Sequence, residues 1–166
     1  DAALLGLVRV LESADAEHDD LVAALRDDEQ ARDRIVGALG ISTALVDHLV
    51  AHPEHWRDAV EAREMTPEER TEALIAEVDA QGDLEPQDAM RVGYRRQLLG
   101  IVARDITAED PVTDLPLTAT ALADLAGSAL EIAVRIAMAE HVGEGEESPV
   151  RFAIIGMGKA GGRELN

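Results

Sequence analysis

The sequence predicts a mostly α-helical protein, in which a helical region is followed by the first strand and glycine-rich turn of an α/β domain. Hydrophobic residues make up 46% of the chain but aromatic residues only 2%. The core must therefore consist of Leu, Ile, Val and Ala, a composition typical of packed helices. Helical patterns continue from Ala2 to about Ala139, whereas Val150–Ile155 is the only convincing strand, a short apolar run that ends at a glycine.

The first third of the chain predicts a series of helices. The charged segment Asp20–Leu39 carries apolar residues at helical spacing, and Gly40 is a plausible stop. Ser42 can cap the short helix that follows. Pro53 ends that helix and suits the first turn of the next one, expected over Glu54–Arg63.

A clear helix start lies at Thr66, which can cap the backbone while Pro67 takes the first helical position. Glu69 completes a capping box, because its carboxylate can reach back to the cap residue. We expect this helix to close at Gly82.

Two longer helices are predicted next. One opens at Pro86 and ends near Ile106, with apolar residues down one face. The turn-forming segment Asp110–Pro116 then predicts a loop. The second long helix is expected over Leu117–His141.

Charge and composition exclude several classes of protein. The formal net charge is -19, from 34 acidic and 15 basic side chains, and such a surface repels nucleic-acid backbones. An acidic surface of this kind is still compatible with a small local pocket that binds a nucleotide. The absence of cysteine excludes disulfides and thiolate metal sites. No stretch resembles a signal peptide or a membrane span, so we expect a cytoplasmic protein that binds neither nucleic acid nor membranes.

The chemistry-bearing motif is the segment Gly156–Asn166, which reads Gly-Met-Gly-Lys-Ala-Gly-Gly-Arg-Glu-Leu-Asn. Closely spaced glycines after a strand bring backbone N–H groups near a ligand, and a helix starting there favours phosphate. Lys159 adds a positive charge. The spacing of Gly156, Gly158 and Gly161 also matches the dinucleotide fingerprint, which needs a further helix, strand and acidic residue. A glycine-rich turn without a ligand is the third interpretation.

The same segment resembles the signature that opens the nucleotidyltransferase domain of glutamine synthetase adenylyltransferases. Its Glu-Leu-Asn is more similar to the N-terminal, adenylyl-removing copy than to the adenylylating copy, and Ala160 stands where the family often has Leu. Blocks upstream also resemble the family: Leu39–Leu45 with His52-Pro53-Glu54, the arginine-rich stretch Met90–Ile106, and Leu117–Ala126.

The helical patterns predict a helical region over residues 1–116, and the resemblance implies the start of a nucleotidyltransferase-like α/β domain over residues 117–166. We interpret the chain as a fragment, because it starts without Met and stops within the motif. In the family an Asp-x-Asp pair that holds two magnesium ions follows the motif. The residues carried over to this sequence are those near the nucleotide phosphates (Gly156, Gly158, Lys159, Gly161 and Gly162) and those close to the metal site (Glu164 and Asn166).

The implied activity of the parent is removal of AMP from a tyrosine of adenylylated glutamine synthetase, by phosphorolysis that gives ADP. The other half would add AMP from ATP, and a P-II signalling protein would choose the direction. The fragment alone is expected to be inactive, since it lacks the Asp-x-Asp. Two alternatives stay open: a dinucleotide-binding oxidoreductase and a non-catalytic helical interaction module.

The densest basic cluster of the sequence is formed by Arg91, Arg95, Arg96 and Arg104. Ion pairing with neighbouring acids on a solvated helix face is the preferred interpretation. The alternative is a groove for the modified substrate or nucleotide.

Three histidines, His48, His52 and His55, lie close together in the sequence. We expect surface histidines rather than a zinc site, because Pro53 interrupts the helix and no matching acidic ligand is evident. No metal ligand is therefore assigned in this chain. Trp56, the single tryptophan, is predicted to anchor the core between helices.

Overall fold

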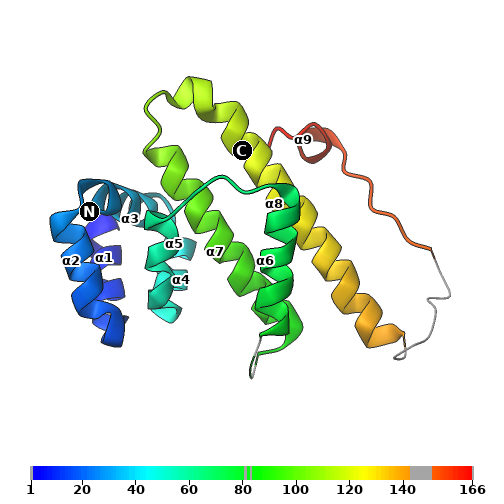
Figure 1. Cartoon of the computed structure of the whole chain (residues 1–166), viewed down its shortest axis with the longest axis horizontal. Coiled ribbons are helices and arrows are strands. Elements are labelled where there is room, and N and C mark those ends of the chain that lie inside the picture. Colours follow the sequence, from blue (N-terminus) through cyan, green and yellow to red (C-terminus); the bar gives the residue numbers. More distant parts are fainter. Residues whose placement is uncertain (1, 81, 83, 143–150, 166) are drawn as a thin grey trace. The chain divides into compact units, whose positions relative to one another are not determined.

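The computed structural model describes residues 2–80, 82, 84–142 and 151–165, and its regular structure is helical (Figure 1). The chain divides into two compact units. The first unit comprises Asp1–Arg63 and Arg95–Leu115, and the second comprises Glu64–Tyr94 and Pro116–Asn166. The helical elements are, in order, α1 (Ala2–Ser13), η1 (Asp15–Glu17), α2 (His18–Asp27), α3 (Glu29–Ile41), α4 (Thr43–Ala51), η2 (Pro53–His55), α5 (Trp56–Val60), α6 (Pro67–Asp79), α7 (Pro86–Ile106), α8 (Pro111–His141) and α9 (Gly158–Gly161).

The core of the first unit is aliphatic, as the composition predicts. It is built from α1 to α5 and the second half of α7. Gly37 allows α3 to approach the end of α7 closely, because a Cβ atom at this position would collide with Ile106. Trp56 is 7% exposed within this core, which confirms its predicted role as an anchor. The largest buried side chains of the core are Leu21, Ile35, Leu39, Leu45, Leu49 and Leu99.

Capping side chains set several of the helix boundaries. The predicted caps Ser42 and Thr66 are confirmed, and Thr66 forms a complete capping box with Glu69. The single helix expected over Asp20–Leu39 is wrong, since it is divided at Asp28. The Asp28 side chain accepts a hydrogen bond from the backbone N–H of Ala31 at 3.0 Å and thereby starts α3.

The loop expected over Asp110–Pro116 is also wrong, because α8 begins at Pro111. Asp110 Oδ1 accepts hydrogen bonds from the backbone N–H groups of Val112 (3.2 Å) and Thr113 (3.3 Å). Asp110 therefore caps the helix and Pro111 fills its first position. Pro116 lies inside the helix, where it removes one backbone hydrogen bond.

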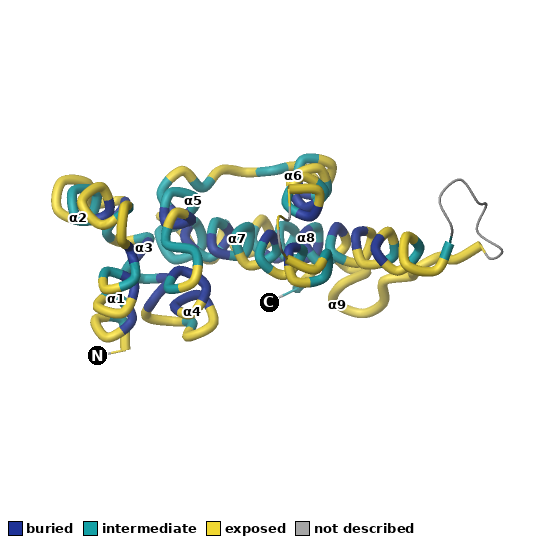
Figure 2. The backbone as a smooth tube through the Cα atoms, turned by 90° about the horizontal axis from the view of Figure 1, so that it is seen from below, coloured by how far each residue is buried: buried dark blue, intermediate teal, exposed yellow. Residues whose placement is uncertain are grey.

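The second unit packs α6 and the first half of α7 with α8. Buried positions recur along α8, mostly at intervals of three to four residues, as the dark blue turns in Figure 2 show. The hydroxyl of Thr71 on α6 donates a hydrogen bond to Ser128 Oγ on α8 at 2.9 Å. Near the end of the same helices, Arg135 pairs with Asp79 at 3.0 Å.

The predicted strand Val150–Ile155 is wrong for its described part. Residues 151–157 have no regular secondary structure, and Val150 lies outside the described residues. A strand forms only when its N–H and C=O groups pair with those of a neighbouring strand. The described part of the chain contains no strand that could take that place.

By length and composition, α8 could cross a membrane, and so could the pair α3 and α4 if the 117° bend between them is disregarded. Core helices of soluble proteins and signal sequences meet the same criterion. These two candidates are therefore weak evidence for a membrane protein.

Candidate functional site

The glycine-rich motif forms a short loop around α9. Gly158 has a φ of +58°, a backbone conformation that favours glycine. Gly161 lies so close to the carbonyl group of Gly156 that a Cβ atom there would collide with it. A Cβ atom at Gly156 would meet only ordinary contacts, the nearest at 3.5 Å. Two of the predicted nucleotide-binding glycines are therefore required by the loop itself, whereas Gly156 is free for another role.

The loop is exposed and is fastened to α8. The guanidinium of Arg163 contacts the carboxylate of Asp124 at 2.6 Å, and the Asp124 side chain is only 12% exposed. The sequence patterns did not predict this pair. The sequence does contain a signal for this contact, because Asp124 is an acidic residue within the otherwise apolar stretch of α8 before Ala126.

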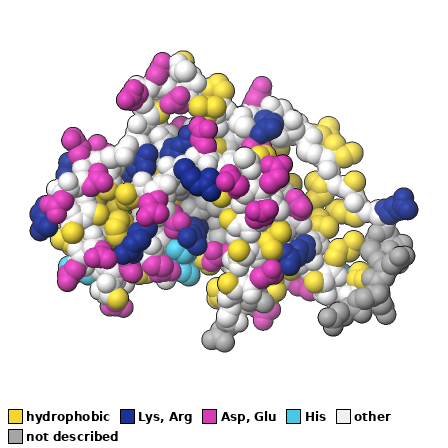
Figure 3. Space-filling view, viewed as in Figure 1, with side chains coloured by type: hydrophobic (Ala, Val, Ile, Leu, Met, Phe, Trp, Pro, Cys, Tyr) yellow, Lys and Arg dark blue, Asp and Glu magenta, His cyan; other side chains and the backbone are white. Residues whose placement is uncertain are grey.

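Lys159 is the sole lysine of the sequence. It lies on α9 in the exposed loop, close in sequence to Arg163. Acidic side chains are spread widely over the face in view in Figure 3 and outnumber basic ones. A local positive charge in these surroundings suits a phosphate-bearing ligand.

A hollow of about 370 Å³ lies between α8 and the segment that leads into the loop. Its walls include Leu130 from α8 and Phe152, Ile154 and Gly156 from the extended segment. Phe152 is 66% exposed and Ile154 is 45% exposed, so these apolar side chains cover the hollow only in part. The glycine-rich loop thus adjoins an apolar groove in the second unit.

The predicted metal-site neighbours do not form a magnesium site by themselves. Glu164 is exposed and offers a carboxylate, the donor type that magnesium prefers. Asn166 lies outside the described residues. Among the residues that the structure describes, no further carboxylate joins Glu164 in a group close enough to hold an ion.

The four arginines of the basic cluster lie along α7 but are divided between the two units. Arg91 belongs to the second unit and pairs with Asp88 at 2.5 Å. Arg95, Arg96 and Arg104 belong to the first unit. Arg96 Nε donates a hydrogen bond to an oxygen of Asp58 on α5 at 2.9 Å. The ion pairing expected from the sequence is confirmed for Arg91 and Arg96.

The histidines depart from the sequence expectation. His48 is 2% exposed and His55 is 7% exposed, so the prediction of surface histidines is wrong for both. The η2 turn at Pro53 brings His55 back to the last turn of α4. There the His48 and His55 rings stack with centroids 5.1 Å apart, and His55 Nδ1 lies 3.1 Å from His48 Nε2. The partly exposed ring of His52 stacks on His55 at 5.2 Å.

Burial also changes the proton affinity of these rings. It lowers the pKa of His48 to about 3, with the neighbouring His55, His52, Arg95 and Arg96 acting in the same direction. Burial lowers the pKa of His55 as well, and nearby carboxylates oppose this shift only partly. Both buried rings are therefore neutral at physiological pH.

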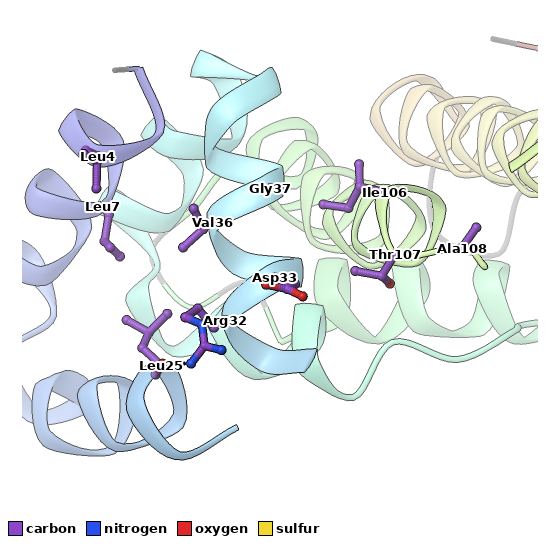
Figure 4. Close-up of a pocket in the computed structure, with 10 residues that line it drawn as sticks. All are labelled: Leu4, Leu7, Leu25, Arg32, Asp33, Val36, Gly37, Ile106, Thr107 and Ala108. Carbon is purple, nitrogen blue, oxygen red and sulfur yellow. Dashed lines mark hydrogen bonds between the residues drawn. The ribbon is translucent and has the colours of Figure 1, made fainter. Parts of the chain in front are cut away.

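A second hollow, of about 750 Å³, lies in the first unit (Figure 4). Its charged lining residues are Arg32 and Asp33, and Arg32 donates a hydrogen bond to the carbonyl of Leu25 at 3.2 Å. The apolar lining comes from α1, α2, α3 and the end of α7, with Leu4, Leu7, Val36 and Ile106 among its residues. The hollow can receive an apolar group, but it contains no constellation of catalytic side chains.

Comparison with known proteins gives one consistent answer. The family model for glutamate-ammonia ligase adenylyltransferase matches residues 32–166. The bifunctional glutamine synthetase adenylyltransferase/adenylyl-removing enzyme of Mycobacterium avium (strain 104) is 40% identical over 172 residues, covering 100% of this chain and 17% of that protein. The enzymes of the same name from Streptomyces avermitilis and Mycobacterium leprae (strain TN) are 42% and 40% identical, and the chain again spans only 16% and 17% of their lengths.

No solved structure matches the chain. The family match includes the glycine-rich loop, α7, α8 and the histidine turn, and it leaves out α1, η1, α2 and the start of α3. It confirms the resemblance detected in the motif and argues against a dinucleotide-binding oxidoreductase. The chain belongs to the glutamate-ammonia ligase adenylyltransferase family.

Proposed function

We propose that this chain is part of the adenylyl-removing half of a bifunctional enzyme that regulates glutamine synthetase. In the reaction, phosphate attacks the adenylyl phosphorus, the bond to the tyrosine oxygen breaks, and ADP is released. The observation that carries the proposal is the match of Gly156–Asn166, with its Glu-Leu-Asn ending, within a family match over residues 32–166.

The proposed role of the loop is to hold nucleotide phosphates. The conformation of Gly158 and the close approach of Gly161 to Gly156 shape the backbone, and Lys159 supplies a positive charge. There is space for a side chain at Gly156. We infer that the absence of a side chain there allows the nucleotide phosphates to approach the backbone closely.

The remaining parts of the proposal concern the parent protein. Its magnesium ions would need carboxylates beyond Glu164, since one carboxylate does not make such a site. For this reason we propose that the isolated 166 residues are inactive. Regulation by a P-II protein, a substrate groove along Arg91, Arg95, Arg96 and Arg104, and a cytoplasmic location belong to the same proposal.

The experiment uses the full-length parent with Gly156→Val, a substitution that fills the space beside the loop, and Gly127→Ala as the matched control, because a Cβ atom at Gly127 meets nothing within 4 Å. Two activities are measured: ADP release from adenylylated glutamine synthetase with phosphate and magnesium, and AMP transfer from ATP to the unmodified protein. We expect Gly156→Val to suppress ADP release and to leave AMP transfer intact.

Loss of AMP transfer with ADP release intact would show that this chain belongs to the other half. Unchanged values for both activities would overturn the role of the loop. ADP release by the isolated 166 residues would contradict their proposed inactivity.

A further inference from the structure

The turn between α4 and α5 gathers three side chains that metal ions bind. Among the described residues, His52, Glu54 and His55 form the one group whose ligand atoms all lie within 4.8 Å of one another. The glutamate supplies the acidic ligand that was not evident from the sequence. Its position follows from η2, which folds Pro53–His55 back against the end of α4.

The distances within this group suit a tetrahedral ion. His52 Nδ1 lies 3.7 Å from Glu54 Oε1, and His55 Nε2 lies 3.5 Å from the same oxygen. Ligands about 2.0–2.1 Å from a zinc ion, at tetrahedral angles, are separated by roughly 3.4 Å. Both distances to the glutamate lie within a few tenths of an ångström of this value, and the ligand atoms of His52 and His55 lie within 4.8 Å of each other.

A fourth residue orients the buried ligand. A metal ion at His55 Nε2 requires the proton of that ring to be on Nδ1, and His48 Nε2, 3.1 Å away, can accept the resulting hydrogen bond. Histidine ligands in metal sites usually donate their other N–H to a fixed acceptor in this way. His48 is itself 2% exposed, so its ring is held in place.

The group formed by His52, Glu54 and His55 is open to solvent on one side. The side chains of His55, His52 and Glu54 are 8%, 29% and 53% exposed, so an ion can enter past the glutamate and keep a water molecule there. Arg96 is a positive charge that acts on the His55 ring, and its Nε donates a hydrogen bond to Asp58. Two imidazoles and one carboxylate form a ligand set that zinc accepts.

We propose that His52, Glu54 and His55 bind a zinc ion, which holds η2 against the end of α4 in the first unit. The site belongs to the first unit, whereas the glycine-rich loop belongs to the second. It is also independent of the proposed function, because the binding test needs no enzymatic activity.

The test uses the 166-residue chain without a polyhistidine tag, freed of metal with EDTA and then dialysed. Zinc chloride is titrated by calorimetry, and cobalt(II) chloride is titrated in parallel to observe the visible absorption of tetrahedral cobalt. We expect one saturable zinc site per chain, a tetrahedral cobalt spectrum, and a melting temperature that rises with zinc concentration.

The variants are His52→Asn and Glu54→Gln, both at partly exposed positions that are compatible with folding, which far-ultraviolet circular dichroism checks. Each should weaken zinc binding by at least about tenfold, since loss of even an outer partner costs 10–100-fold. His18→Asn is the matched control, because His18 forms an exposed contact of the same kind with Asp19 at 3.3 Å. Absence of saturable binding in the unaltered chain, equal affinity in all variants, or loss only with His18→Asn would overturn the proposal.

Discussion

The indole nitrogen of Trp56 donates a hydrogen bond to Glu17 Oε2 at 3.2 Å and thereby joins α5 to η1, 39 residues earlier in the chain. The neighbouring Arg57 pairs with the same carboxylate oxygen and with Asp20. Its guanidinium also lies 4.6 Å from the centre of the Trp56 ring. The Glu17 carboxylate thus binds both the buried indole of Trp56 and the more exposed guanidinium of Arg57.

Glu17→Ala should lower the free energy of unfolding by about 1–2 kcal/mol, because it leaves the indole N–H of Trp56 without its acceptor. Urea denaturation followed by tryptophan fluorescence measures the change. Glu12→Ala, at an exposed acid near the end of α1, should change stability by less than about 0.5 kcal/mol. Equal effects of the two substitutions would show that the hydrogen bond contributes nothing.

Thr66→Ala should lower stability by about 1 kcal/mol, since it removes the acceptor for the Glu69 N–H at the start of α6. Thr66→Ser keeps the hydroxyl and should retain most of this energy. Urea denaturation of both variants, with amide exchange at the first turn of α6, gives the comparison. A serine variant as unstable as the alanine variant would contradict the capping role.

Gly161→Ala should distort the glycine-rich loop, because the new methyl group would collide with the Gly156 carbonyl. Gly156→Ala should leave the loop nearly unchanged. The measurement is the amide chemical shifts of Arg163 and Glu164, two residues that come shortly after Gly161 in the sequence. If the alanine at residue 156 shifted these signals as strongly as the one at residue 161, the described loop geometry would be wrong.

Stability of the metal-free protein should decrease as the pH falls from 7 to 5. The pKa of His48 is about 3 in the folded chain and about 6.5 in the unfolded chain, so only the unfolded chain takes up the proton in this range. The stability is therefore fully present above pH 6.5 and is lost toward acid, by about 2 kcal/mol at pH 5.

The check is urea denaturation at pH 7 and pH 5 with EDTA present, a window above the range in which most carboxylates titrate. His48→Leu should reduce the pH dependence, although His55, whose pKa is also lowered, keeps part of it. An identical pH dependence in the variant would show that His48 is not the responsible group.

The helix boundaries that the sequence predicted correctly are those fixed by neighbouring residues. Thr66 and Glu69 satisfy each other within one turn, and Ser42 caps α4 by a contact three residues away. The range Pro86–Ile106 was also correct, because proline marks the start and the apolar stripe marks the length. Such signals need no knowledge of the rest of the fold.

The errors concern features that depend on distant or absent partners. The burial of His48 and His55 follows from the packing of the η2 turn, which no periodicity reveals. The strand expected at Val150–Ile155 would require a neighbouring strand. At the glycine-rich loop, the pattern indicated which glycines matter, but the contact of Arg163 with Asp124 joins positions 39 residues apart.

The division of α7 between the two units has a practical consequence for recombinant expression. Leu99 and Ala103 belong to the core of the first unit, so the shortest continuous piece that contains this unit whole is 1–115. That piece also carries α6 with Leu74 and Val78, which are buried in the second unit. Without Pro116–Asn166 these side chains would be left uncovered, and a clone that ends at Leu115 should aggregate. No single truncation isolates either unit, and expression of the first unit alone requires residues 64–94 to be replaced by a designed linker.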